Sequence, residues 1–461
     1  MMPVGKRDLP SVTDALETVA ATAKRMRLAE FDAFAVSKAS RSVTIERGGV
    51  CGADSRIATA LHVRACIDGM VGGAFCNSFE GGEVSRCLAE AAGIARLMAP
   101  DRRWSGFPAG ADSYRSVPGL YDRSVASTDV ATLGIMAEEM IDGAMSVSKK
   151  VAVPYGAVEA IERSVGVANS SGVDVVMKET QLQAVICCVA GSGVAISPDC
   201  EESGMSRGCD LRTDRIGERA GWIADRSTHL VKASTEECEV VFSPMSLGAS
   251  DSGLLTVALS KAFSGQSVMQ RTSFLMDRVG EQVWSDRVTM SDNPLLSGRC
   301  GSRPFDDEGL PTSKTQMVRK GVLREFLWDS YFGSLSGEGS TGNAVRDLAS
   351  GSVGVAPLCL QLTPGRGNMH SLIEEVGHGY LVWGGQGSHT SNPETGEFSF
   401  VASPGLLIED GEVVGGVRGA MISGNISAFM KSIEIVGGDV VDFGNSLMPS
   451  VLFRDVKVTT G

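Results

Sequence analysis

The sequence is poor in several residue types, and each scarcity narrows what the protein can be. Histidine occurs only five times, and aromatic residues make up 6% of the 461 residues. No two of the eleven cysteines form a C-x-x-C pair and their number is odd, which argues against a thiolate metal site and a disulfide framework. Cys187 and Cys188 lie in an apolar run, where thiols behave as small buried hydrophobes. We therefore expect a reducing, cytoplasmic compartment.

Positive charge and long apolar runs are also scarce. Lys and Arg number 42 against 55 Asp and Glu, so the net charge is −13. Nucleic-acid binding needs clustered Lys and Arg, and no such stripe is present. No apolar run approaches the roughly 20 residues that span a bilayer, and the first residues, "MMPVGKRDLPSVTD", contain no apolar signal core. The sequence predicts no nucleic-acid partner, no membrane span and no secretion.

What the sequence does contain is enough apolar material for a large core. Hydrophobic residues make up 43% and glycine occurs 56 times, which is typical of a globular protein rich in turns. A chain of this length favours two domains, which we predict at residues 1–235 and 236–461. The predicted class is α+β, with an N-terminal α/β-type layer domain and a C-terminal, mostly antiparallel β domain carrying a few packed helices.

The pattern of each half supports this division. Apolar residues at helical spacing predict helices over 11–27, 81–99, 128–149, 215–232 and 252–265. Alternating runs predict a hairpin turning at Gly48-Gly49, a break at Asp68-Gly69, and strands over 151–168, 173–190 and 238–244. The polar composition of 104–120 and 197–215 predicts loops. After residue 265 the chain reads as short strands separated by glycine turns.

The stretch "IEEVGHGY", residues 373–380, differs at one residue from a zinc-protease motif, because a histidine in place of Ile373 would give H-E-E-V-G-H. His370, Glu374 and His378 are spaced four apart and would share a helix face. The two histidines would nevertheless be separated by about 12 Å of helical rise, whereas donors to one zinc lie within roughly 4 Å of each other. Gly377 and Gly379 favour a helix end here, with His378 interacting with the helix dipole. We interpret the stretch as a capped helix end.

No group of residues in the sequence indicates a catalytic site by its chemistry alone. Several stretches, however, resemble one family. "RPFDDEGLPTSKTQMVRKGVLREFLWDS" (303–330), "STGNAVR" (340–346) and "NPETGEFSFVASPGLLIEDGEVVGGVRGAMISGN" (392–425) resemble successive signatures of the TldD/PmbA proteins. These are also called the TldD/TldE metalloprotease family and, by an older label, modulators of DNA gyrase. "RSVTIERGGV" and "VGVANSSGVDVVMKET" match less sharply in the first half. The acidic charge gives the gyrase label little support.

The resemblance also predicts where a metal site would lie. The catalytic TldD branch carries an H-E-x-x-x-H helix ahead of the D-x-E-G stretch and a cysteine near the C-terminus. The matching segment here is "LLTVALSKAFSG", which has Thr256, Val257 and Lys261 at the His, Glu and His positions. A lysine ammonium repels a divalent cation, and the last cysteine is Cys359. The chain therefore resembles the TldE (PmbA) branch, which lacks the zinc motif.

The resemblance implies a non-catalytic subunit without a cofactor of its own. It would pair with a TldD-type zinc subunit and help to enclose a chamber that admits unfolded or extended peptides. His370, Glu374, His378 and His389 are candidates to line that chamber. A stand-alone homodimer that binds peptides without cleaving them remains the alternative, and a metallopeptidase with a relocated zinc site on the late histidines is a third. Because the H-E-x-x-x-H motif is absent, proteolysis by the chain alone is not expected.

Overall fold

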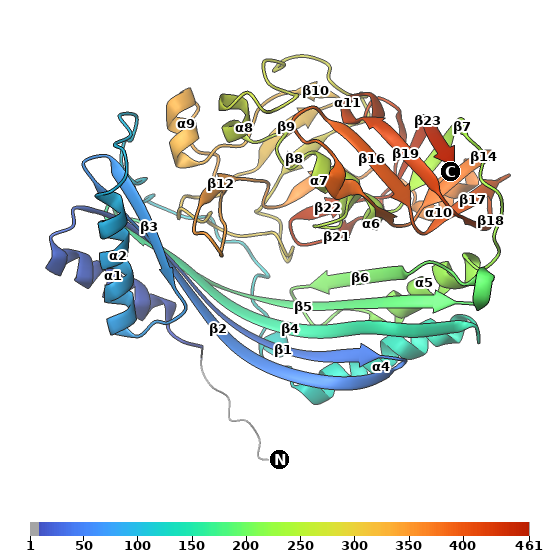
Figure 1. Ribbon diagram of the computed structural model, residues 1–461, viewed down its shortest axis with the longest axis horizontal. Helices are drawn as coiled ribbons and strands as arrows, with labels where there is room; N and C mark the ends of the chain where they lie inside the picture. Colours follow the sequence, from blue (N-terminus) through green and yellow to red (C-terminus); the bar gives the residue numbers. More distant parts are fainter. Residues whose placement is uncertain (1–8, 461) are drawn as a thin grey trace.

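Long antiparallel strands dominate the first half of the computed structural model (Figure 1), which describes residues 9–460 with the exception of the Val194 side chain. They form one sheet in the order β3-β2-β1-β4-β5-β6. The strands are β1 Glu30–Glu46, β2 Gly49–Ile67, β3 Met70–Cys76, β4 Val151–Asn169, β5 Asp174–Ala190 and β6 Cys200–Ser206. The hairpin at Gly48-Gly49 and the break at Asp68-Gly69 are confirmed, with positive φ at Gly48 and Gly69.

Helices cover one face of this sheet, and the side-chain alternation of β1 shows which one. The helices are α1 Val12–Met26, α2 Gly81–Ala95, α3 Arg123–Ser127, α4 Val130–Val147 and α5 Thr213–Arg226. Odd-numbered residues of β1, such as Ala35 and Ile45, are buried with them. Even-numbered residues point to the other face, where Phe34 packs against Phe305 of the second half. The curved sheet therefore has helices on one face and the second half across the other (Figure 1). The second half also packs against α5, because Ile373 and Leu406 belong to the same core as Ile223.

Helices α4 and α5 pack closely because three glycines line their contact. A Cβ atom added at Gly217 would lie 1.9 Å from the carbonyl oxygen of Met140, and one at Gly221 would lie 2.4 Å from that of Ala144. Gly143 of α4 approaches α5 in the same way. The backbones touch where side chains would otherwise hold them apart.

The second half is mainly antiparallel sheet with short helices, which confirms the predicted class. One sheet runs β15-β16-β19-β23-β7-β14-β17-β18, with β20 paired to β23, and another runs β10-β9-β8-β13-β22-β21. Two pairs, β7–β14 and β13–β22, are parallel. The strands of the first sheet are β7 Glu236–Phe242, β14 His378–Val382, β15 Gly385–Gln386, β16 Glu397–Ala402, β17 Gly405–Glu409, β18 Glu412–Val417, β19 Ala420–Asn425, β20 Ile433–Val436 and β23 Val451–Thr460.

The remaining elements pack around these sheets. The other strands are β8 Met290–Asp292, β9 Thr315–Arg319, β10 Val322–Leu323, β11 Ala344–Arg346, β12 Val353–Val355, β13 Leu360–Leu362, β21 Val441–Asp442 and β22 Ser446–Met448. The helices are α6 Pro244–Gly248, α7 Leu254–Ala258, α8 Gly265–Met269, α9 Ser330–Ser336, α10 Met369–Glu374 and α11 Ile426–Phe429, with short 3₁₀ turns η1 Gly193–Ala195 and η2 Ser388–Thr390. The core between them is aromatic-rich and includes Phe242, Phe263, Trp284, Phe400 and Phe453.

Three sequence predictions need correction. The helix predicted over 252–265 is only α7, because the backbone of Phe263 and Gly265 forms hydrogen bonds with Leu327 instead of continuing the helix. The loop predicted over 197–215 contains β6, an edge strand of polar composition in which Glu201 is exposed and Glu202 is buried, and the first residues of α5. The helix predicted over 215–232 ends at Arg226.

Two further findings concern the helices and the cysteines. No helix among the described residues is long and apolar enough to cross a membrane. All eleven cysteines are free, and Cys187 and Cys188 are buried as predicted. The prediction that no secretion signal is present rests partly on residues 1–8, which lie outside the described residues.

Candidate functional site

The segment that the resemblance aligns with a metal helix has ordinary structural contacts. The Thr256 hydroxyl donates a hydrogen bond to the carbonyl oxygen of Gly248 at 3.0 Å. Lys261 lies beyond the end of α7, half-exposed, with Nζ 4.0 Å from an Oε1 of Glu394. Between residues 9 and 460, no three His, Cys, Asp or Glu side chains are grouped so that they could hold a metal ion. Our interpretation of Thr256, Val257 and Lys261 as degenerate metal positions stays a prediction.

The predicted capped helix end at His378 is wrong. Helix α10 ends at Glu374, and His378 is the first residue of β14, which lies between β7 and β17 in the sheet. Gly379 permits this pairing, since a Cβ there would lie 2.0 Å from the carbonyl oxygen of Glu239. His378 Nε2 lies 3.0 Å from Oε1 of Glu236, and this hydrogen bond raises the pKa of His378. Ladder hydrogen bonds to two neighbouring strands outweigh the local helix-ending signal.

The four candidate chamber residues do not form one site. His370 and Glu374 form an exposed i,i+4 pair on α10 at 3.3 Å. His378 lies at a strand end beside Glu236 and Glu409. His389 is in η2, which packs against α7 and is held there by a hydrogen bond from Ser388 Oγ to the carbonyl oxygen of Ser252 at 2.7 Å. Their role as chamber lining stays a prediction.

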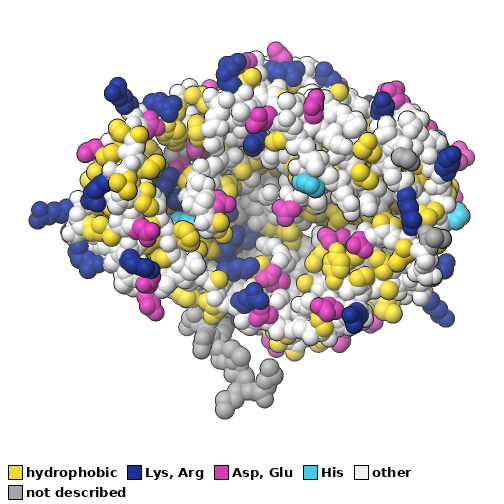
Figure 2. All heavy atoms as spheres, in the orientation of Figure 1, with side chains coloured by type: hydrophobic (Ala, Val, Ile, Leu, Met, Phe, Trp, Pro, Cys, Tyr) yellow, Lys and Arg dark blue, Asp and Glu magenta, His cyan; other side chains and the backbone are white. Residues whose placement is uncertain are grey.

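A groove runs across the face of the first sheet that does not carry helices. It has a volume of about 510 Å³, and a hollow between the two halves is visible in Figure 2. Its lining is mostly small and polar and includes Ser40, Ser42, Thr44, Glu159, Gln183, Ser203 and Met205. Glu159 is neutralised by Lys38 at 3.5 Å and accepts a hydrogen bond from Gln183 at 2.7 Å. The groove thus offers hydroxyl and amide groups with paired charges.

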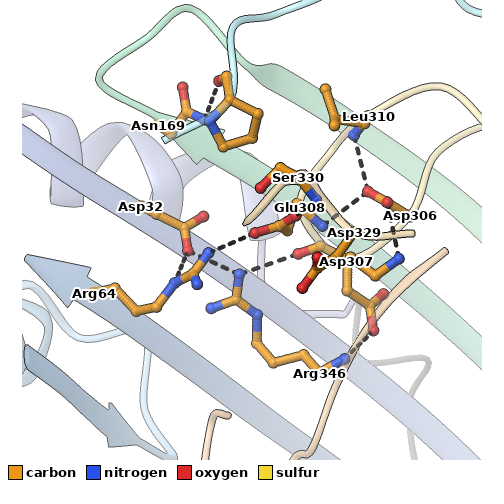
Figure 3. Close-up of polar contacts among 12 residues, drawn as sticks. Asp32, Arg64, Asn169, Asp306, Asp307, Glu308, Leu310, Asp329, Ser330 and Arg346 are labelled. Carbon is orange, nitrogen blue, oxygen red and sulfur yellow. Dashed lines mark hydrogen bonds and ion pairs between the residues drawn. The ribbon is translucent and has the colours of Figure 1, made fainter. Parts of the chain in front are cut away.

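A buried ion network joins the two halves (Figure 3). Asp32 of β1 lies 2.7 Å from Arg64 of β2 and 2.8 Å from Arg346 of β11. Arg64 also reaches Glu308 at 3.4 Å. Burial alone would raise the pKa of Asp32, but Arg346 and Arg64 hold it below its usual value. The network therefore ties the sheet to the second half by ionised groups that are buried or nearly buried.

The D-D-E-G stretch organises the second-half side of this network. Asp306 accepts hydrogen bonds from the backbone N–H groups of Glu308, Leu310 and Ala344, each at 3.0 Å. Burial raises the pKa of Asp306 well above its usual value. The Asp307 carboxylate lies 2.7 Å from Arg303 and accepts from the Arg346 backbone N–H at 2.8 Å. The sequence marked this stretch only through the resemblance; its role in holding the two halves together depends on Asp32 and Arg64, far away in the chain.

A second buried contact joins the two halves at Arg207, directly after β6. Arg207, 4% exposed, donates hydrogen bonds to the carbonyl oxygens of Arg299, Cys300 and Ser302. Its Nη1 lies 2.7 Å from Glu179 Oε2. Burial opposes the ionisation of Glu179, but Arg163 and Arg207 lower its pKa to about 2.

Replacing Asp329 with asparagine is expected to stabilise the protein above pH 6. Asp329 caps α9 by accepting a hydrogen bond from Phe332 N at 2.7 Å, and burial raises its pKa to about 6. This folded-state pKa lies above the unfolded value of about 4, so ionising Asp329 costs stability progressively between about pH 4 and pH 6. Asparagine keeps the cap and removes this cost, which is about 3 kcal/mol.

The measurement is guanidinium unfolding of both proteins at pH 4 and pH 8. The two free energies of unfolding should agree at pH 4, and Asp329→Asn should be the more stable at pH 8. A variant that is destabilised equally at both pH values would contradict the argument, because it would show that the charge of Asp329 carries no cost.

The C-terminal half shows which class of domain the chain contains. Residues 235–460 match the PmbA/TldA metallopeptidase C-terminal domain. The C-terminal half of the chain is therefore a PmbA/TldD-family domain, which confirms the resemblance found in the sequence.

Individual relatives resemble it over different lengths. The uncharacterized protein MJ0231 of Methanocaldococcus jannaschii is 28% identical over 90% of this chain and 92% of its own. The metalloprotease PmbA homolog of Haemophilus influenzae is 32% identical, but the match covers 50% of this chain and 47% of that protein. The crystal structure of TldE from Thermococcus kodakarensis superposes with a TM-score of 0.89 at 28% identity, covering 96% of this chain and 100% of that one.

Proposed function

We propose that this chain is a non-catalytic, TldE/PmbA-type subunit that pairs with a TldD-type zinc subunit and helps it to process unfolded or extended peptides. The observation that carries the proposal is the chemistry of residues 254–261. Thr256 uses its hydroxyl as a donor to a backbone carbonyl, and Lys261 places a cation beside Glu394. Neither arrangement supplies a metal ligand in the position where the catalytic branch would have one.

The polar groove supports a role in holding peptide. Edge strand β6 contributes Ser203 and Met205 to its lining, and it pairs only with β5 among the described strands. An extended peptide can add to such an edge through main-chain hydrogen bonds, which read no particular sequence. Because the groove lies on the sheet face that is turned toward the second half, it suits flexible chains better than folded ones. The free cysteines are consistent with work in the reducing cytoplasm.

The test compares the chain purified alone with the chain purified in the presence of a TldD-type relative from the same cell. Alone, it should contain no stoichiometric zinc by elemental analysis and leave casein and unstructured peptides uncut. With the relative it should form a stable complex whose zinc belongs to the partner. One tightly bound zinc per chain in the lone protein, lost on His378→Ala, would overturn the proposal and support a relocated metal site.

A second candidate function is peptide binding by a homodimer without any catalytic partner. One observation favours it. The lining of the groove comes entirely from the first sheet of this chain, so the groove needs no residue of a catalytic partner. Size measurement of the native complex separates the two candidates. Co-purification with a TldD-type subunit supports the first, whereas a peptide-binding assembly containing only this chain supports the second.

A further inference from the structure

A second cavity lies outside the groove, between α5 of the first half and the second half. It has a volume of about 620 Å³, within the usual range of small-molecule sites. Figure 1 shows α5 close to α10 and β18 at the right of the molecule. The lining residues are Trp222, Met369, Ile373, Trp383 and Val413, with Arg219, Arg226, His370, Glu218 and Glu412 among the polar groups.

The cavity has an aromatic wall. The rings of Trp222 and Trp383 lie with centroids 5.9 Å apart and an interplanar angle of 43°. Trp383 is buried, and Trp222 is half-buried on α5. Met369 and Ile373 of α10 extend the apolar surface. Such a wall accommodates an aromatic or large aliphatic side chain.

Most charges at this cavity are already paired. Arg219 lies 3.3 Å from Glu202, and His370 lies 3.3 Å from Glu374. Glu218 forms an ion pair with Arg215.

Two exposed charges of opposite sign remain. Among residues 9–460, neither Arg226 nor Glu412 has an ion-pair partner; the guanidinium of Arg226 lies 6.0 Å from the Trp222 ring centroid. A ligand that carries one carboxylate and one ammonium group complements this pair.

We propose that this cavity binds a short zwitterionic peptide of about dipeptide size that bears an aromatic side chain. Arg226 receives the free carboxylate, Glu412 receives the free ammonium group, and the side chain packs against Trp222 and Trp383. A site that reads both ends of a peptide selects a fully cleaved fragment and excludes the interior of a longer chain. The proposal does not depend on the catalytic status of the chain.

Isothermal titration of the full-length chain with glycyl-L-phenylalanine tests the proposal. The two blocked forms are N-acetyl-glycyl-L-phenylalanine, without the ammonium group, and glycyl-L-phenylalanine amide, without the carboxylate. The free dipeptide should bind at least about tenfold more tightly than either blocked form, since each blocked form loses one charge-assisted contact. Binding should also change tryptophan fluorescence, and Trp222→Phe should reduce that change.

Variants of Arg226 and Glu412 test which end of the dipeptide each side chain binds. Arg226→Gln should weaken binding of the free dipeptide about tenfold and abolish its advantage over the amide. Glu412→Gln should abolish the advantage over the N-acetyl form. Arg212→Gln is the matched control, because Arg212 precedes the same helix but pairs with Asp214 outside the cavity. Arg226 and Glu412 are exposed, so both variants should keep the thermal unfolding profile of the parent protein.

Three results would overturn the proposal: no saturable signal at millimolar dipeptide, equal affinity for the free and blocked peptides, or unchanged binding in both Arg226→Gln and Glu412→Gln. The zinc and proteolysis assays of the proposed function do not involve this cavity. Failure of one proposal is therefore distinguishable from failure of the other.

Discussion

Replacing Glu179 with glutamine is expected to lower the free energy of unfolding by about 3–5 kcal/mol at pH 7, the usual cost of removing one partner from a buried ion pair. Glu179 is 2% exposed and is flanked by Arg163 and Arg207. Glutamine cannot neutralise the buried Arg207, whose hydrogen bonds hold residues 299–302 of the second half. The substitution should therefore weaken the contact between the halves as well as the sheet.

Chemical unfolding at several pH values measures this effect and its cause. The folded-state pKa of about 2 lies below the unfolded value, so the contribution of Glu179 is fully present above about pH 4.5 and is lost as the pH falls toward 2. The difference between parent and variant should shrink over that range. Glu46→Gln, an exposed residue at the end of β1, is the control and should change stability by less than about 0.5 kcal/mol. A pH-independent difference would refute the electrostatic explanation.

Substituting alanine for Gly217 is expected to destabilise the first half by as much as about 3 kcal/mol, the upper range for overpacking. The new Cβ would lie 1.9 Å from the Met140 carbonyl oxygen, which belongs to the backbone of α4 and cannot rotate away. Helices α4 and α5 must then separate. Because α5 carries Trp222 and Arg226, the variant should also lose affinity for the dipeptide.

Gly134→Ala is the matched control for this prediction. Gly134 lies within α4, but nothing lies within 4 Å of an added Cβ. Alanine there should stabilise the protein by about 0.5–1 kcal/mol through its better helix propensity. Thermal unfolding of the two variants should shift in opposite directions. If both raised the midpoint, the close approach of α4 and α5 would carry no energetic weight.

Most of the first sheet could be predicted from the sequence because its signals are local. The alternation along β1 and β4 and the turn at Gly48-Gly49 are readable in windows of a few residues, and the structure confirms them. Edge strand β6 was missed because one of its sides and one of its edges face water, so its composition resembles that of a loop.

The candidate site could be predicted only in part. The sequence predicted degenerate metal-helix positions, which no observation of the structure tests. It also predicted that His370, Glu374 and His378 share one helix face, which is wrong for His378. It could not show that the strand beginning at His378 pairs with β7 and β17, because pairing with strands elsewhere in the chain leaves no local signal. Arg226 and Glu412 carried no signal at all: an unpaired charge on a helix and another on a hairpin look like any solvated residues.

By itself the sequence determined the α+β class and the resemblance of the C-terminal half to the PmbA/TldD family, because periodicity and motif order are properties of the chain read in order. The tertiary structure decided which charges are paired. Asp32 meets Arg346 and Glu179 meets Arg207 only after the sheet curves against the second half. Ion pairing depends on distances between groups far apart in the chain, and folding alone sets those distances.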